Sequence, residues 1–228
     1  YAALGELAKP HVNVITVEDP VEKNIEGINQ CQVNAKAGMT FAAALRSILR
    51  QDPDIVMVGE MRDQETAEIA IRAAITGHMV LSTLHTNDAA STITRLVDMG
   101  VAPYMVATSL IGIVAQRLCK VVCNECKTPR MSTPEENELL GITESATIYD
   151  ACGCPKCNNT GYTGRTAIHE ILLCTHEMAS LIAADGKVDA ISSLAKEQGC
   201  KLLRDNVAEL VLEGRTTLDE LVKLTFAV

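Results

Sequence analysis

The sequence contains no tryptophan, and aromatic residues make up only 3% of its 228 residues. Its core must therefore be built from aliphatic side chains, since hydrophobic residues as a whole reach 47%. With so few rings, the stacking platforms that bind single-stranded nucleic acid are not visible. A formal net charge of −9 also argues against a nucleic-acid motor, because binding without sequence preference needs a basic surface.

Long apolar runs are missing as well. No run reaches the roughly 18 apolar residues of a transmembrane helix, and the first residues do not have the pattern of a signal peptide. We therefore expect a cytoplasmic protein that reaches a membrane only indirectly, through a protein partner. The length suits one large domain or an α/β core with small appendages.

In the first half of the chain, short apolar runs alternate with helical patterns. The runs 12–17, 55–58 and 79–84 show no polar alternation, which is typical of strands buried on both faces of a parallel sheet. Apolar spacing, caps and glycine stops predict helices over 41–50, 64–76, 86–99 and 104–118. The sequence therefore predicts an α/β fold, with a mostly parallel sheet and covering helices.

Charged and imidazole side chains follow these predicted strands. Glu18 and Asp19 follow the first, Glu60 the second, and His85 the third. Ligands bind beyond the carboxyl ends of strands in open α/β sheets, so we expect these side chains to converge on one crevice. A buried strand that ends in an acid is typical of a Walker B segment, whose carboxylate holds magnesium or polarises an attacking water.

Each of these residues also has an ordinary structural interpretation. The acidic pair before Pro20 is typical of a strand-ending turn, and single histidines at strand ends are usually structural. Arg62 faces phosphate in one interpretation and pairs with Asp63 in the other. Three such strand ends at one edge favour a site over three separate turns.

The pattern changes after Leu118. Residues 119–165 hold six of the nine cysteines and little periodicity. Two CxxC pairs stand 27 residues apart, at Cys123, Cys126, Cys154 and Cys157. Four thiolates in this arrangement are typical of a closed structural zinc site, and the metal would supply folding energy that this segment's few apolar residues do not.

Other interpretations of the cysteines remain open. Reduced surface thiols are one; a redox dithiol is another, although it needs no second CxxC pair. Cys152 could compete as a ligand. The remaining cysteines are interpreted as small buried hydrophobic residues: Cys31, Cys119, Cys174 and Cys200.

The rest of the sequence predicts mainly helices. Thr133 begins a capping-box pattern for a short helix to Leu140. An apolar run at 166–174 predicts a strand. Four helices are expected beyond it, separated by glycines, at 177–184, 187–198, 201–213 and 217–225.

Three motifs in order resemble one family, the ATPases of type II secretion and type IV pilus assembly. Residues 14–22 (VITVEDPVE) resemble its Asp box and 45–63 its Walker B region. Residues 76–87 resemble its His box, and the likeness continues through the cysteine pairs and 161–165 (GYTGR) to near the C-terminus. Motifs of this length and order are highly specific.

The resemblance implies a partial RecA-like P-loop NTPase core over 1–118, a four-cysteine zinc subdomain over 119–165, and a C-terminal strand and helical subdomain over 166–228. It implies a homo-hexamer that uses ATP and Mg²⁺, holds Zn²⁺, and works peripherally at the inner membrane on a platform protein of a secretion or pilus machine. The four cysteines favour the assembly and secretion branch over retraction motors, which lack them.

The resemblance also implies roles at the strand ends. Glu18 would be the general base, supported by Asp19, and Glu60 would help to hold magnesium. His85, with His78 as a further candidate, would sense the γ-phosphate or relay its loss to a neighbouring subunit. Arg62 would join this network.

One departure from the family is plain: this chain contains no GxxxxGK[ST] run. Without that backbone cradle, lysine and hydroxyl, we expect ATP hydrolysis from the longer protein and none from this fragment alone. The alternative is a zinc-stabilised docking module with a non-functional ATP site.

Overall fold

The computed structural model describes residues 1–226, and side chains as far as Thr225. The chain forms two compact units. Unit 1 comprises 1–86, 90–111 and 174–191, and unit 2 comprises 87–89, 112–173 and 192–226. Each is described by itself.

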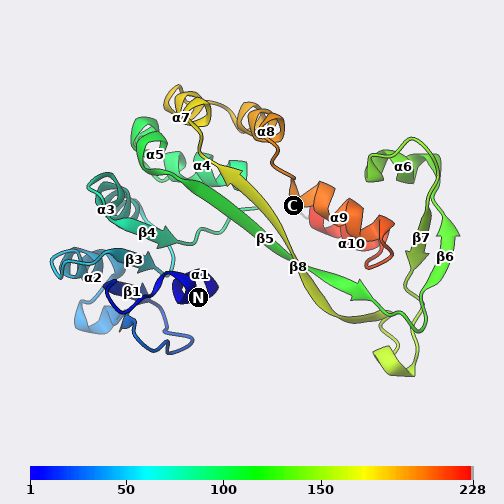
Figure 1. The fold of residues 1–228 in the computed structure, drawn as a ribbon, viewed down its shortest axis with the longest axis horizontal. Helices are drawn as coiled ribbons and strands as arrows, with labels where there is room; N and C mark the ends of the chain where they lie inside the picture. The colour runs from blue at the N-terminus through cyan, green and yellow to red at the C-terminus, as the bar shows by residue number, and fades with distance from the viewer. Residues whose placement is uncertain (227–228) are drawn as a thin grey trace. The chain divides into compact units, whose positions relative to one another are not determined.

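Unit 1 is built on a parallel four-stranded sheet in the order β2-β1-β3-β4. Strands β1, β3 and β4 are labelled side by side in Figure 1. The strands are β1 (Val14–Glu18), β2 (Asn29–Gln32), β3 (Ile55–Val58) and β4 (Met79–Ser82). The register pairs Val17 of β1 with Val58 of β3, and Val58 with Ser82 of β4. The predicted parallel sheet is confirmed, whereas β2, which is largely polar, was not predicted.

Helices cover both faces of this sheet, which explains why its central strands β1 and β3 are mainly apolar. Ile15 and Val17 of β1 pack with α2 (Phe41–Ile48) and α3 (Gln64–Ile75), as do the matching residues of β3. Val14 faces the other way, toward Leu4 of helix α1. The alternation follows from the two-residue period of a strand.

The helices begin where their caps predict. Thr40 accepts the amide N–H of Ala43 at the start of α2, and Asp63 accepts that of Thr66 at the start of α3. Helix α1 spans Ala2–Leu7. The other elements of unit 1 are η1 (Ala35–Ala37), most of α4 (Ala89–Asp98), α5 (Pro103–Ser109), α7 (His176–Ala183) and the first part of α8 (Val188–Glu197).

Unit 2 is organised around a long antiparallel ribbon of β5 (Gly112–Val122) and β8 (Tyr162–Leu173). A second two-stranded sheet pairs β6 (Thr128–Met131) with β7 (Thr147–Asp150). The helical elements are α6 (Pro134–Leu140), η2 (Pro155–Cys157), α9 (Leu203–Leu212) and α10 (Leu218–Phe226). The Thr133 capping box is confirmed, with both reciprocal hydrogen bonds present.

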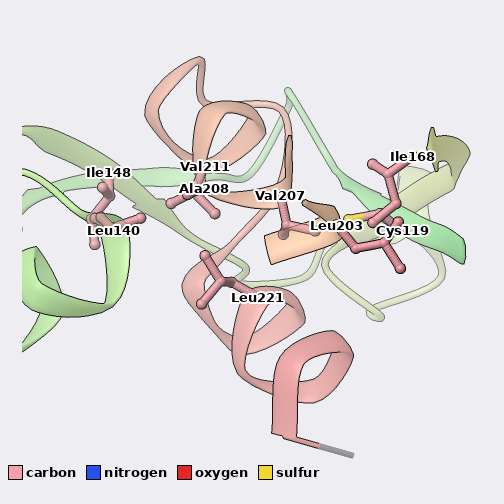
Figure 2. Close-up of a cluster of buried hydrophobic side chains, with 9 residues drawn as sticks. All are labelled: Cys119, Leu140, Ile148, Ile168, Leu203, Val207, Ala208, Val211 and Leu221. Carbon is pink, nitrogen blue, oxygen red and sulfur yellow. The ribbon is translucent and has the colours of Figure 1, made fainter. Parts of the chain in front are cut away.

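One buried cluster joins these elements, and Figure 2 shows its side chains gathered around α9 and α10. Its members are Cys119, Leu140, Ile148, Ile168, Leu203, Val207, Ala208, Val211 and Leu221. Segment 119–165 contributes only three of these residues. Its apolar side chains are therefore buried by packing against the C-terminal helices rather than against one another.

The helix predicted over 104–118 is wrong in its second half. Helix α5 ends at Ser109, and the chain enters β5 at Gly112. Pairing along the whole of β8 outweighs the helical spacing, and Ile113, Val114 and Val122 are β-branched residues that suit a strand. The boundary expected at 118 therefore falls inside β5.

The remaining expectations from the second half agree with the structure. The strand at 166–174 is present as β8, which starts earlier, and four helices follow it. Within residues 1–226, no helix combines the length and apolar character needed to cross a bilayer.

We expect Leu221→Ala to lower the free energy of unfolding of unit 2 by about 3 kcal/mol, because the fully buried side chain leaves a cavity. Equilibrium urea unfolding measures this loss. Leu118→Ala is the matched control, since Leu118 is 54% exposed and should change stability little. Equal effects from both substitutions would contradict this assignment of the core.

Candidate functional site

Three strand ends meet at the carboxyl edge of the unit 1 sheet. Strand β1 ends at Glu18, and Glu60 lies two residues beyond the end of β3. His85 lies three residues beyond the end of β4. Because β1, β3 and β4 are adjacent and parallel, these segments leave the sheet at the same edge.

Gly59 lets the β3 end lie close to β1. Its amide donates to the carbonyl of Val17 at 2.7 Å. A Cβ on Gly59 would stand 3.2 Å from that carbonyl oxygen and 3.3 Å from the Cα of Glu18, closer than ordinary contact. A side chain here would push the two strand ends apart, so glycine is needed for the close approach.

Glu18 is buried, with only 4% of its surface exposed, and both carboxylate oxygens accept hydrogen bonds. Thr16 Oγ1 and Gln30 Nε2 donate to Oε1 at 2.5 and 3.0 Å. The Tyr1 hydroxyl donates to Oε2. A buried carboxylate held in this way has a fixed orientation.

These hydrogen bonds decide the charge of Glu18. Burial raises the pKa of its carboxyl, but the donors Thr16, Tyr1 and Gln30 together outweigh it and bring the pKa below the ordinary value. Glu18 is therefore ionised at neutral pH. It is an anion beside the sheet edge, available to accept a proton or bind a cation.

Glu60 forms a second centre with Arg62 and His85. Its Oε1 lies 2.6 Å from Arg62 Nη2, and its Oε2 lies 3.4 Å from His85 Nε2. The Glu60 side chain is 12% exposed, whereas those of Arg62 and His85 are 68% and 89% exposed. A largely buried carboxylate thus holds two exposed nitrogen groups at the edge.

The hydrogen bond from Arg62 lowers the pKa of Glu60, with a smaller contribution from His85. The same hydrogen bond raises the pKa of Arg62, and the charge of Asp19 adds to it. Asp19 therefore acts electrostatically on the Glu60 centre across the strand ends. Arg62 pairs with Glu60, a partner that neither sequence interpretation named, since one placed Arg62 at phosphate and the other paired it with Asp63.

Hydroxyl groups tie the loop after β4 to the loop after β3. Ser82 Oγ donates to the carbonyl of Val58 at 2.8 Å, and Thr83 Oγ1 to that of Gly59 at 2.6 Å. The amide of Met61 returns to the carbonyl of Thr83 at 3.1 Å. These contacts fix where Glu60 and His85 lie relative to each other.

The structure does not bring His78 to this edge. It precedes β4, so it lies at the amino end of the strand, and its Nδ1 is 3.1 Å from the carbonyl of Ala73. Sequence reasoning also missed Tyr1, Thr16 and Gln30. Thr16 carried a signal, since it is a lone polar residue inside an apolar strand; the other two carried none.

The four predicted cysteines meet in unit 2. All four Sγ atoms lie within 4.8 Å of one another, at Cys123, Cys126, Cys154 and Cys157. Three of the pairs are 3.8 to 3.9 Å apart. Tetrahedral zinc with Zn–S bonds of about 2.3 Å places its sulfur ligands roughly 3.8 Å apart, so the thiols fit a zinc ion.

Backbone amides surround these sulfurs. Gly153 N–H points to Cys126 Sγ at 3.2 Å, and the amides of Cys154 and Gly161 point to Cys157 Sγ at 3.1 and 3.3 Å. Burial raises the pKa of Cys157, but the amides of Cys154 and Gly161, together with the neighbouring thiols, outweigh it and lower the pKa to about 6. At Cys126 burial outweighs the Gly153 amide and raises the pKa to about 12, so within the cluster the thiolate is favoured at Cys157. Such donors stabilise the thiolate that a metal binds.

The other cysteines stand apart from this group. Cys152 is exposed, and its Sγ contacts the Thr128 hydroxyl at 2.9 Å, so it is not a member of the cluster. Cys119 is fully buried, as expected. Cys31, Cys174 and Cys200 are only partly buried, so the prediction that they are buried holds fully for Cys119 alone among these four.

Comparisons with known proteins agree with this geometry. A family model described as type II/IV secretion system protein matches residues 1–223. Type II secretion system protein E of Pseudomonas aeruginosa is 49% identical over 227 residues, which are 99% of this chain and 45% of the relative. Type IV pilus assembly ATPase PilB of Thermus thermophilus is 49% identical over 229 residues, 99% of this chain and 26% of the relative.

The fold matches solved structures too. The pilus retraction motor PilT with bound ADP superposes with a TM-score of 0.72 at 28% identity, covering 97% of this chain and 55% of that one. The Legionella pneumophila ATPase DotB has the same fold, with a TM-score of 0.65. This chain spans about half or less of the length of the relatives it matches.

The parallel sheet with its acidic carboxyl edge, the four-cysteine cluster and the sequence match over residues 1–223 together lead to one conclusion: the chain belongs to the type II/IV secretion system protein family.

Proposed function

We propose that this chain supplies the hydrolytic side of the ATP site in a longer motor protein, which drives pilus assembly or pseudopilus-dependent secretion. The observation that carries the proposal is the convergence of ionised Glu18 and the Glu60 centre at one sheet edge. In α/β proteins this edge is where ligands bind. The relatives' names, a pilus assembly ATPase among them, support the same chemistry.

When bound, ATP would supply the phosphoanhydride bond and Mg²⁺ would neutralise the charge that develops on phosphate. Glu18 acts as general base and takes a proton from the attacking water at Oε2, while Thr16 and Gln30 hold Oε1. The Tyr1 hydroxyl donates to Oε2 in this structure, and the attacking water replaces it as the donor when ATP is bound. Asp19 supports the base through its charge.

Glu60 helps to hold the metal through its carboxylate, which is ionised and nearly buried. Arg62 and His85, held by Glu60 and largely exposed, reach outward from the edge toward phosphate. His85 senses the γ-phosphate. For His78, at the opposite end of β4, relay to a neighbouring subunit of a homo-hexamer is the role compatible with its place.

The four-cysteine cluster is a closed structural zinc site in this proposal. Zn²⁺ would tie Cys123 and Cys126, beyond β5, to Cys154 and Cys157, before β8. This unit would contact the inner-membrane platform protein from the cytoplasmic side. A docking module with a non-functional ATP site is the second candidate, and the turnover of the longer protein distinguishes the two.

In the longer protein, we expect Glu18→Gln to lower kcat for ATP by at least about 100-fold, because the amide cannot take the proton from water. Steady-state turnover measures this, together with binding of a fluorescent ATP analogue, which should persist. Glu26→Gln, at an exposed acid of the same segment, is the matched control. Full activity in Glu18→Gln would contradict the assignment of the base.

The 228-residue chain alone should show no magnesium-dependent ATP turnover, because no segment in it can cradle the phosphates. Phosphate release measures this at high protein concentration. A longer chain that also contains a GxxxxGK[ST] segment should turn over ATP. Turnover by the chain alone would contradict the proposal, and an inactive longer protein would favour the docking module.

Cys154→Ser should reduce bound zinc from one per chain to near zero and unfold unit 2 while leaving unit 1 folded, since metal binding supplies folding energy. Elemental analysis and thermal unfolding measure the two effects. Cys152→Ser is the control, because its sulfur lies outside the cluster. Zinc loss in Cys152→Ser, or full zinc in Cys154→Ser, would count against the site.

A further inference from the structure

A short segment between β4 and α4 belongs to unit 2, although the chain on both sides of it belongs to unit 1. The segment is 87–89, which is preceded by 1–86 and followed by 90–111 of unit 1. Only Thr86 separates Asn87 from His85. Side chains that bond Asn87 therefore restrain the chain two positions after His85, the proposed phosphate sensor.

Glu170 of β8 holds one end of the segment. This carboxylate is 3% exposed, and both of its oxygens accept backbone amides. Ala89 N–H donates to Oε1 and Leu203 N–H to Oε2, each at 3.0 Å. These amides belong to the first residues of α4 and α9, so one buried anion caps two helix N-termini, where negative charge is favourable.

Arg117 of β5 holds the other end. Its Nη2 donates to Asn87 Oδ1 at 2.9 Å and approaches the Asn87 carbonyl at 3.4 Å. Ala115 is the residue directly opposite Glu170 in the ribbon, so Arg117, two positions further on, lies diagonally from Glu170 on the same face. Two charged side chains from paired strands thus clamp a three-residue segment.

We propose that Glu170 and Arg117 are positioning residues that hold segment 87–89 and, through the covalent chain, restrict the loop that carries His85. The clamp lies wholly in unit 2, and its effect reaches His85 through the covalent chain. The Glu170 carboxylate also caps α9. Movement of the His85 loop and movement of the start of α9 would therefore both change hydrogen bonds to this one carboxylate. The consequence for turnover rests on the function proposed above for His85.

The test uses the longer protein and the variants Glu170→Gln and Arg117→Gln. Glutamine keeps the shape of Glu170 but replaces one accepting oxygen with an NH₂ group, so one helix start loses its cap. Glu136→Gln is the matched control, since Glu136 also caps a helix start in unit 2, at Thr133, away from 87–89. Zinc content and thermal unfolding check that each variant is folded.

We expect hydrogen exchange at amides 85–89 to accelerate in both clamp variants and to stay unchanged in Glu136→Gln. We expect kcat to fall about 10-fold, with the KM for ATP within twofold. Combined with His85→Ala, Glu170→Gln should cause no further loss, because both changes act at the same step. If Glu170 had a purely structural role, the fold-losses in kcat of the two single variants would multiply in the double variant.

Unchanged exchange at 85–89 in both variants would overturn the clamp, as would a multiplicative double variant. Arg117→Gln keeps the test decisive if Glu170→Gln does not fold, since the Arg117 side chain is only partly buried. Faster exchange with normal turnover by His85→Ala would leave the clamp standing and refute the role proposed for His85. The two proposals therefore fail in distinguishable ways.

Discussion

The parallel pairing of β1, β3 and β4 is the constraint on which the candidate site depends. It brings three segments, separated by dozens of residues in the chain, to one edge of a sheet. Helices on both faces make the central strands mainly apolar, so most polar side chains lie where the strands end, and Thr16 inside β1 is satisfied by bonding Glu18. Gly59 then allows the β3 end to approach the backbone of Glu18 more closely than any other residue would permit.

At that edge the carboxylates of Glu18 and Glu60 are kept ionised by different contacts. Glu18 is buried and held by three uncharged donors, which, with a smaller effect of the charge at the N-terminus, keep it ionised without an ion pair. Glu60 is ionised chiefly because Arg62 pairs with it. A carboxylate free of a cationic partner suits proton transfer, whereas one within a charged network suits the binding of metal and phosphate.

Unit 2 depends on a different source of stability. Its segment around the cysteines contributes few residues to the buried cluster and depends on α9 and α10 for the rest (Figure 2). Four thiols at tetrahedral spacing gather beyond the end of β5 and before the start of β8. Backbone amides at Cys157 favour its thiolate form, which is the form that a metal binds.

The sequence alone determined the central strands, most helices and their caps, and the two CxxC pairs, because each depends on local periodicity or fixed spacing. The convergence of Glu18, Glu60 and His85 was predictable because strand ends in a parallel sheet share an edge. The strand β5 was not, since its pairing with β8 is a contact across dozens of residues that overrode a helical pattern. The placement of His78 away from the edge followed from its position before β4.

Only the tertiary structure decided the partners of the charged groups. Tyr1 and Gln30 reach Glu18 from other elements, Arg62 pairs with Glu60, and Glu170 caps two helices that are far apart in sequence. No period or motif records such contacts, because they depend on how separate elements pack in space. Spacing specifies which residues can act, and packing decides which of them meet.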